Sequence, residues 1–386
     1  MSWPRDDTKL DRVRALMGEQ ELDALVVRAP DNVLYLTNFW GMKGYDACVF
    51  PREGEPVLVC LEASKEDAAR TAWTSYVRMF QSYDERDPRP PTSRVLELAK
   101  EVAREYDRVG LELSLGTQAA DRMVGEPTTF TAAWFTEFGD AVDATPLLSS
   151  ARAVKSEQEI ERMRLANDIA AAAMEHCRLV IEPGMSEAQI AAEWEGYVHG
   201  EGTGWAEGKV DLALGFSLVW SGPGIKTFTA TTARPVVADE PTLFEIWVCT
   251  DGYWCDHTKN LVVGELTPQY RELEAGLMAV YEAAVDFVRP GASLAELDRR
   301  IRAGIDAMGF PGQPSHPICH GVGARAHEPP YAHQAGGGEI AAGMILAIEP
   351  GCYIEGGGGL RVEDNFLVTS DGAEKLSPFP DGIVRA

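Results

Sequence analysis

The chain has 386 residues, of which 45% are hydrophobic, and a formal net charge of −25. The length predicts two domains or one large one, and the apolar content argues against a disordered chain. The acidic excess argues against nucleic acid and anionic membranes as partners, because like charges repel. Since the sequence has no membrane-length apolar run and no signal-peptide core at its charged N-terminus, we expect a soluble cytoplasmic protein.

Helical and extended patterns alternate through the first 146 residues. Residues 8–27 predict a helix and then a strand, residues 31–39 a second strand, and residues 46–60 two strands around a turn. Residues 93–106 have the apolar spacing of an amphipathic helix. This alternation indicates an α/β domain, which we place at residues 1–150.

The pattern changes in residues 151–386, which we assign to a second domain. A Ser-x-x-Glu signal at Ser156 predicts the start of a long helix, and Ser186 is expected to cap the helix that follows. Strands dominate from residue 210 onward, apart from one helical stretch at 267–308.

A strong hairpin signal lies in this second domain. Asp251 and Gly252 separate two strand-like runs and predict a two-residue turn. In the resulting register residue 247 faces residue 256, so Glu245 lies diagonally across from Asp256 on one face of the ribbon. Diagonal neighbours are about 7–8 Å apart at the backbone, which is within reach of a shared ion. The hairpin can therefore offer two carboxylates to one point.

More candidates for the same site follow towards the C-terminus. His320 and His327 flank a glycine-containing loop, Glu349 ends a strand-like run, and Arg361 and Glu363 share one face of an alternating segment. Singly, each could be a solvated acid, a turn residue or a hydrogen-bonded histidine. Four acids in one pocket, however, would repel each other and take up protons unless cations bound there. Oxygen-rich ligation with one imidazole suits manganese, cobalt or zinc in a two-metal site.

The order of these motifs resembles the pita-bread metallohydrolases, in particular the two-domain branch of prolidase, aminopeptidase P and creatinase. The motifs are an acid separated from Asp256 by ten residues, then HGxG-x3-His, Ile-Glu-Pro-Gly and Arg-x-Glu-Asp. Residues 21–39 and 151–167 also resemble segments of that branch. The resemblance implies an α+β protein: an N-terminal creatinase-like α/β domain followed by a C-terminal pita-bread catalytic domain. It also implies a homodimer.

The resemblance further implies a role for each candidate. Two divalent metal ions are expected, with manganese favoured over cobalt or zinc, and their ligands would be Glu245, Asp256, His320, Glu349 and Glu363. Glu349 would also be the general base that accepts a proton from the attacking water. His327 would face the substrate and stabilise the developing oxyanion, or would have only a structural role. Arg361 would orient the neighbouring acids.

Two positions depart from the family pattern. Glu245 stands where the family has aspartate, and its extra methylene moves the carboxylate by roughly a bond length, so the metal spacing changes or one ion binds weakly. Prolyl peptidases of the family also carry a histidine after an SGPN-like stretch. Here that stretch is SGPG, and no histidine occurs between His199 and His257, which weakens a strict Xaa-Pro specificity. His257 should point to the opposite face of its strand from Asp256.

The implied function is metal-dependent hydrolysis of a peptide or amide C–N bond in a short peptide, like that of an Xaa-Pro dipeptidase or aminopeptidase P. The alternative is a non-peptidase of the same fold acting on a small metabolite or osmolyte, like creatinase, ectoine hydrolase or dimethylsulfoniopropionate lyase. Trp220, Trp247 and Trp254 would then line the substrate site, because aromatic faces favour cations, or would only pack. A third possibility, a catalytically inactive binding module, does not account for the charged cluster.

Overall fold

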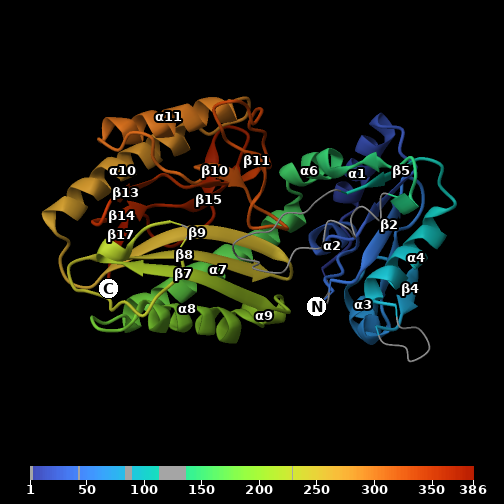
Figure 1. Ribbon diagram of the computed structural model, residues 1–386, viewed down its shortest axis with the longest axis horizontal. Helices are drawn as coiled ribbons and strands as arrows, with labels where there is room; N and C mark the ends of the chain where they lie inside the picture. The colour runs from blue at the N-terminus through green and yellow to red at the C-terminus, as the bar shows by residue number, and fades with distance from the viewer. Residues whose placement is uncertain (1–2, 42–43, 83–88, 113–135, 228) are drawn as a thin grey trace. The chain divides into compact units, whose positions relative to one another are not determined.

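The computed structural model of the chain describes residues 3–41, 44–82, 89–112, 136–227 and 229–386. Its contacts divide the chain into two compact units, Met1–Arg152 and Ala153–Ala386 (Figure 1). In these described stretches, no helix combines the length and the apolar character needed to cross a bilayer.

The N-terminal unit is a three-layer α/β structure around a six-stranded mixed sheet in the order β4-β3-β2-β1-β5-β6. The strands are β1 (Ala24–Val27), β2 (Ala47–Pro51), β3 (Val57–Leu61), β4 (Val77–Phe80), β5 (Val109–Leu111) and β6 (Val142–Asp143). The helices are α1 (Asp7–Glu19), α2 (Pro30–Thr37), the 3-10 helix η1 (Glu62–Ser64), α3 (Lys65–Thr71), α4 (Pro91–Ala103) and α6 (Thr145–Ala153). Alternate residues of the central strands enter two separate cores, one with α1 and α2 and one with α4.

The strand predicted at residues 31–39 is wrong, because this segment forms the helix α2. Pro30 favours a helix start, since its φ is preset and its missing amide hydrogen would be unpaired there anyway. Asn38 adopts the left-handed conformation, with φ 59°, and ends the helix. Nearly every residue of α2 is buried, so the segment lacks the polar face by which a helical period is recognised.

The C-terminal unit contains two sheets and a two-stranded ribbon, β13-β14. The four-stranded sheet has the order β17-β9-β8-β7 and the five-stranded sheet the order β11-β10-β12-β15-β16. The strands are β7 (Ala213–Ser221), β8 (Pro241–Thr250), β9 (Tyr253–Val262), β10 (Cys319–Gly321), β11 (Glu328–Tyr331), β12 (Ile345–Ile348), β13 (Gly351–Ile354), β14 (Gly358–Arg361), β15 (Asp364–Val368), β16 (Ala373–Lys375) and β17 (Ile383–Arg385).

Two pairs of long helices cover the outer faces of these sheets (Figure 1). The helices of the unit are α7 (Glu157–Val180), α8 (Glu187–Gly202), α9 (Trp205–Gly208), the 3-10 helix η2 (Gly222–Gly224), α10 (Pro268–Phe287) and α11 (Leu294–Ala307). α7 and α8 share a core with the four-stranded sheet, and α10 and α11 share one with the five-stranded sheet. The inner faces of the two sheets are thereby left uncovered by these helices.

The predicted helix starts in this unit are confirmed. The hydroxyl groups of Ser156 and Ser186 each accept a hydrogen bond from the amide three residues on, and the side chain at that position accepts one in return. The single helical stretch expected at 267–308 is instead two helices, α10 and α11. They are separated at Pro290-Gly291, where Gly291 has a φ of 83°.

The predicted hairpin register is also confirmed. Asp251 and Gly252 both have positive φ, 48° and 89°, as a type I′ turn requires. Trp247 faces Asp256 across the β8–β9 pair. Because side chains alternate along a strand, Glu245 and Asp256 share the inner face, while Phe244, Ile246 and Cys255 enter the core with α7 and α8.

Candidate metal centre

The candidate residues come from strands of both sheets in the C-terminal unit. Asp256 lies on β9 and His320 on β10, while Glu349 directly follows β12 and Glu363 lies between β14 and β15. An isolated bridge between Thr258 and Glu363 joins the hairpin to the segment that enters the second sheet. Strand pairing therefore brings together residues that are distant in sequence.

The three carboxylates converge on the imidazole of His320. Its Nε2 atom lies 3.6 Å from Asp256 Oδ2, 3.4 Å from Glu349 Oε1 and 3.8 Å from Glu363 Oε1. Two groups of three potential ligands result, each with atoms within 4.8 Å of one another: Asp256, His320 and His327, and His320, Glu349 and Glu363. The side chains of the three acids and His320 are all at most 7% exposed, so water does not screen their charges.

The donor atoms fit a divalent cation. His320 Nδ1 lies 3.0 Å from the carbonyl oxygen of Gly321, which places the ring proton on Nδ1 and leaves the Nε2 lone pair free. Within the described part of the chain, Nε2 and both carboxylate oxygens of Asp256 have no hydrogen bond of normal geometry. Buried polar atoms without partners are rare in proteins, and a missing ion is one of their ordinary explanations.

The electrostatics of the cluster lead to the same conclusion. Burial and the neighbouring carboxylates raise the pKa of Asp256 well above its ordinary value, and they raise the pKa of Glu363 to about 8. Burial alone would also raise the pKa of Glu349, but His316 and His320 lie beside it and lower it. Three enclosed carboxylates cannot all stay ionised without a cation, so the centre has an unbalanced negative charge.

His327 lies at the edge of the cluster. Its Nε2 atom is 3.3 Å from Asp256 Oδ2, and its ring centroid is 4.4 Å from that of His320. Burial and the proximity of His320 lower the pKa of His327, which favours a neutral imidazole at neutral pH. Its side chain is 27% exposed, whereas that of His320 is fully enclosed, so a substrate could reach His327 from solvent.

Glu245 is not brought into either group of ligands. Its carboxylate instead contacts the guanidinium group of Arg361, which is buried. Burial alone would lower the pKa of Arg361, but Glu245 and the other nearby carboxylates raise it. Arg361 Nε donates to Thr258 Oγ1 at 2.7 Å, and this hydroxyl donates to Glu363 Oε2 at 2.8 Å. Arg361 thus reaches a candidate ligand through Thr258.

The strand register places the three candidate tryptophans on the inner face of the four-stranded sheet. Trp220 and Trp247 are buried and Trp254 is half-buried. Trp247 stacks on Phe216, with ring centroids 5.4 Å apart, and its ring lies 6.3 Å from that of His327. Of the three, Trp247 is the one with a ring contact to a candidate site residue.

Sequence reasoning missed His316. Its Nδ1 atom lies 3.1 Å from Glu349 Oε2, and its Nε2 atom lies 3.0 Å from the hydroxyl of Tyr353. His316 precedes His320 by four residues on the segment that leads into β10. Residues four apart on an extended segment share a face, and this spacing was the available signal.

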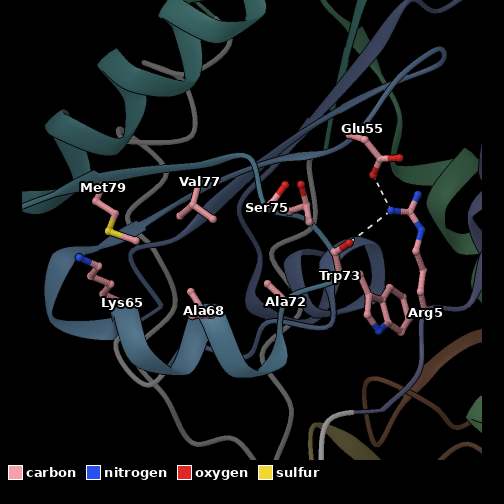
Figure 2. A pocket seen from close by; sticks show the side chains of 11 residues that line it. Arg5, Glu55, Lys65, Ala68, Ala72, Trp73, Ser75, Val77 and Met79 are labelled. Carbon is pink, nitrogen blue, oxygen red and sulfur yellow. Dashed lines mark hydrogen bonds and ion pairs between the residues drawn. The ribbon is translucent and has the colours of Figure 1, made fainter.

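A separate pocket lies in the N-terminal unit, where its volume is about 720 Å³. Figure 2 shows its lining from α3 and β4, with Lys65 and Met79 at one side and the Arg5–Glu55 ion pair at the other. The charged groups of its lining are Arg5, Glu55 and Lys65, so it offers no cluster of carboxylates and imidazoles. The candidate metal centre therefore rests on the side-chain cluster of the C-terminal unit.

Comparisons with known proteins cover both units. Residues 161–370 match the model of metallopeptidase family M24, and residues 9–166 match that of the creatinase/prolidase N-terminal domain. An Xaa-Pro dipeptidase of Lactobacillus delbrueckii subsp. lactis is 25% identical over 96% of both chains. An uncharacterized peptidase of Bacillus subtilis, YqhT, is 23% identical over 97% of this chain and 99% of its own.

Solved structures show the same fold. The prolidase of Pyrococcus horikoshii is 22% identical, with a TM-score of 0.80 over 97% of this chain and 99% of that one. An Xaa-Pro dipeptidase of Bacillus anthracis is 21% identical, with a TM-score of 0.81 over 98% of this chain and 99% of that one. These matches confirm the expected fold class, a creatinase-like α/β domain followed by a pita-bread domain. Because the family match spans more than half of the chain, this protein belongs to metallopeptidase family M24 and is a metallohydrolase.

Proposed function

We propose that this protein hydrolyses the C–N bond of a dipeptide or short peptide, with Xaa-Pro substrates as the first class to examine. The observation that carries the proposal is the convergence of Asp256, Glu349 and Glu363 on His320, all of them buried. The Xaa-Pro dipeptidase and prolidase names of relatives and structural neighbours favour this substrate class.

We assign the divalent ion to the carboxylates of Asp256, Glu349 and Glu363 together with Nε2 of His320. Carboxylate-rich ligation favours manganese, with cobalt and zinc as the other candidates. When bound, such an ion polarises the scissile carbonyl and lowers the pKa of water. The family pattern adds a second ion beside Glu245, which is where this chain departs from that pattern.

The chain's own residues divide the remaining work. Glu349 accepts the proton of the attacking water, because its contact with His316 keeps its carboxylate ionised. His327, neutral and partly exposed, donates a hydrogen bond to the oxygen on which negative charge develops. Arg361 orients Glu363 through the hydroxyl of Thr258.

The test is a dipeptide panel assayed with metal-stripped protein, before and after addition of manganese. We expect cleavage of Xaa-Pro or related dipeptides only after the metal is restored. Matched peptides with alanine in place of proline would show whether prolyl specificity survives without the histidine that prolyl peptidases carry after the SGPG position. Metal-independent cleavage would contradict the proposal. So would the absence of cleavage of any peptide after addition of manganese, cobalt or zinc.

A second candidate function is supported by the aromatic wall beside His327. Trp247 and Phe216 stack there, and aromatic faces favour cationic ligands. A small cationic metabolite, such as a betaine, a sulfonium compound or ectoine, would suit this surface. Calorimetry with these compounds should give a heat signal that is lost in Trp247→Leu, whereas no signal with any of them would leave Trp247 a packing residue.

A further inference from the structure

The four acids of the candidate centre fall into two sets. Asp256, Glu349 and Glu363 surround His320, whereas Glu245 belongs to neither group of potential ligands. Glu245 lies on β8 directly opposite Thr258 of β9. Since Thr258 contacts both Arg361 and Glu363, Glu245 is near the centre but faces a cation that the chain itself supplies.

Arg361 depends on Glu245 for its charge balance. The Arg361 side chain is 2% exposed, and the hydrogen bonds of its guanidinium group go to the neutral hydroxyls of Thr258, at 2.7 Å, and Tyr353, at 3.4 Å. Within the described part of the chain, Glu245 is the acid with which Arg361 forms an ion pair. A buried charge whose partner is withdrawn is strongly destabilised, so Glu245 is not free to turn towards a metal ion.

The length of the side chain at position 245 explains this arrangement. A glutamate carries its carboxylate about 1.5 Å farther from the backbone than an aspartate does, which is large against the roughly 0.2 Å tolerance of metal–ligand distances. In this chain the added reach places the carboxylate against Arg361. With Glu245 neutralised in this way, three carboxylates and one imidazole remain, enough for one four-ligand site.

We propose that the centre binds one divalent ion, at Asp256, His320, Glu349 and Glu363, and that the Glu245–Arg361 ion pair takes the place of a second ion. This proposal rests on the proposed function, because it requires the centre to bind metal. The second positive charge at the centre is then a fixed guanidinium group, which chelators cannot remove. Activity should accordingly saturate with one metal equivalent per chain.

The decisive experiment measures metal stoichiometry on the unmodified full-length chain. Chelator-stripped protein is titrated with manganese by calorimetry, and the loaded protein is examined by elemental analysis and electron paramagnetic resonance. We expect one ion per chain with the six-line spectrum of isolated manganese. Two ions per chain with an exchange-coupled spectrum would overturn the inference and leave the proposed function intact. No bound ion at saturating metal would overturn both.

Two matched amide variants then locate the ion. Glu245→Gln should retain one ion per chain with a dissociation constant within about 10-fold of that of the wild type, because Glu245 is not a ligand. Asp256→Asn, the control, should weaken binding by about 100-fold or more, because it removes a ligand. If Glu245→Gln lost an ion relative to the wild type, the assignment would be wrong. Since the wild-type stoichiometry needs no variant, a folding defect in either protein leaves the test standing.

Discussion

Two buried polar clusters lie back to back in the C-terminal unit and differ in charge balance. Asp256 and Glu363 point to the candidate metal centre, whereas their neighbours in sequence, His257 and Asp364, point the other way. As predicted from strand alternation, His257 is therefore no part of the centre. Asp364 contacts Lys259 Nζ at 2.6 Å, His257 Nδ1 at 3.2 Å and Lys375 Nζ at 3.4 Å.

The two clusters differ in charge balance. This difference distinguishes a structural group of charges, the balanced cluster around Asp364, from a functional one, the unbalanced cluster around Asp256. Burial alone would raise the pKa of Asp364, but Lys259 and His257 lower it far below its ordinary value. For Asp256 the balance is the reverse, because burial and Glu363 raise its pKa well above the ordinary value. A cluster whose positive and negative charges balance stabilises the fold. A cluster with excess negative charge is suited to bind a cation from solution.

The largest expected effect is on catalysis at the unbalanced cluster. Glu349→Gln keeps the size of the side chain but cannot accept a proton, so we expect kcat to fall by about 10³–10⁴-fold. This corresponds to about 4–5 kcal/mol at 1.36 kcal/mol per tenfold change. Steady-state kinetics of the manganese-loaded variant would measure it, with circular dichroism as the check on folding. Turnover within 10-fold of the wild type would remove Glu349 from the role of general base.

The balanced cluster should respond in stability instead. Asp364→Asn leaves Lys259 buried with Asp381, 3.8 Å away, as its remaining acid, so we expect a loss of about 3–5 kcal/mol in the free energy of unfolding. Denaturant unfolding of metal-free protein would measure this loss. The matched variant is Asp256→Asn on the other side of the strand, which relieves repulsion and should leave metal-free stability unchanged or higher. Equal destabilisation by the two variants would erase the distinction between the clusters.

The fold of the catalytic unit could be predicted from sequence because its signals are local. The turn at Asp251-Gly252 sets the hairpin register, and the serine caps set the starts of α7 and α8. The helix α2 could not be found in this way, because it is buried almost all round and an apolar run without a polar face is ambiguous between helix and strand. The helical conformation of that segment depends on its burial in the tertiary structure, which a single sequence does not show.

The residues of the candidate site could be predicted from the sequence, but the contacts between them could be predicted less well. Strand alternation grouped Glu245 with Asp256 and Arg361 with Glu363, and the family resemblance suggested roles for Glu349 and both histidines. The observed register brings Asp256 and Thr258 opposite Trp247 and Glu245. That Glu245 contacts Arg361 depends on two segments more than 100 residues apart. The four-residue spacing of His316 and His320 marks a shared face, but the contact of His316 with Glu349 depends on the pairing of β10 with β12.

Metal addition should stabilise the unbalanced cluster and leave the balanced one unaffected. A ligand that binds only the folded state adds about 2.7 kcal/mol at 100 times its dissociation constant. We therefore expect manganese to raise the Tm of metal-stripped protein, and Asp256→Asn to lose this rise. Asp364→Asn should keep the rise, although it starts from a lower Tm. Thermal unfolding across a manganese series would measure all three proteins, and an undiminished rise in Asp256→Asn would show that the ion binds elsewhere.

The smallest effect concerns the imidazole that keeps the base of the unbalanced cluster ionised. His316 touches Glu349 but not the other proposed ligands, so it acts as a positioning residue and is the counterpart here of Lys259 beside Asp364. We expect His316→Gln to lower kcat by about 10–100-fold, a range typical of groups that support a metal site from outside. KM and bound metal should be nearly unchanged, because neither the substrate surface at His327 nor the four ligands are altered. Kinetics combined with elemental analysis separate this outcome from a structural role, in which metal content and Tm would fall together with kcat.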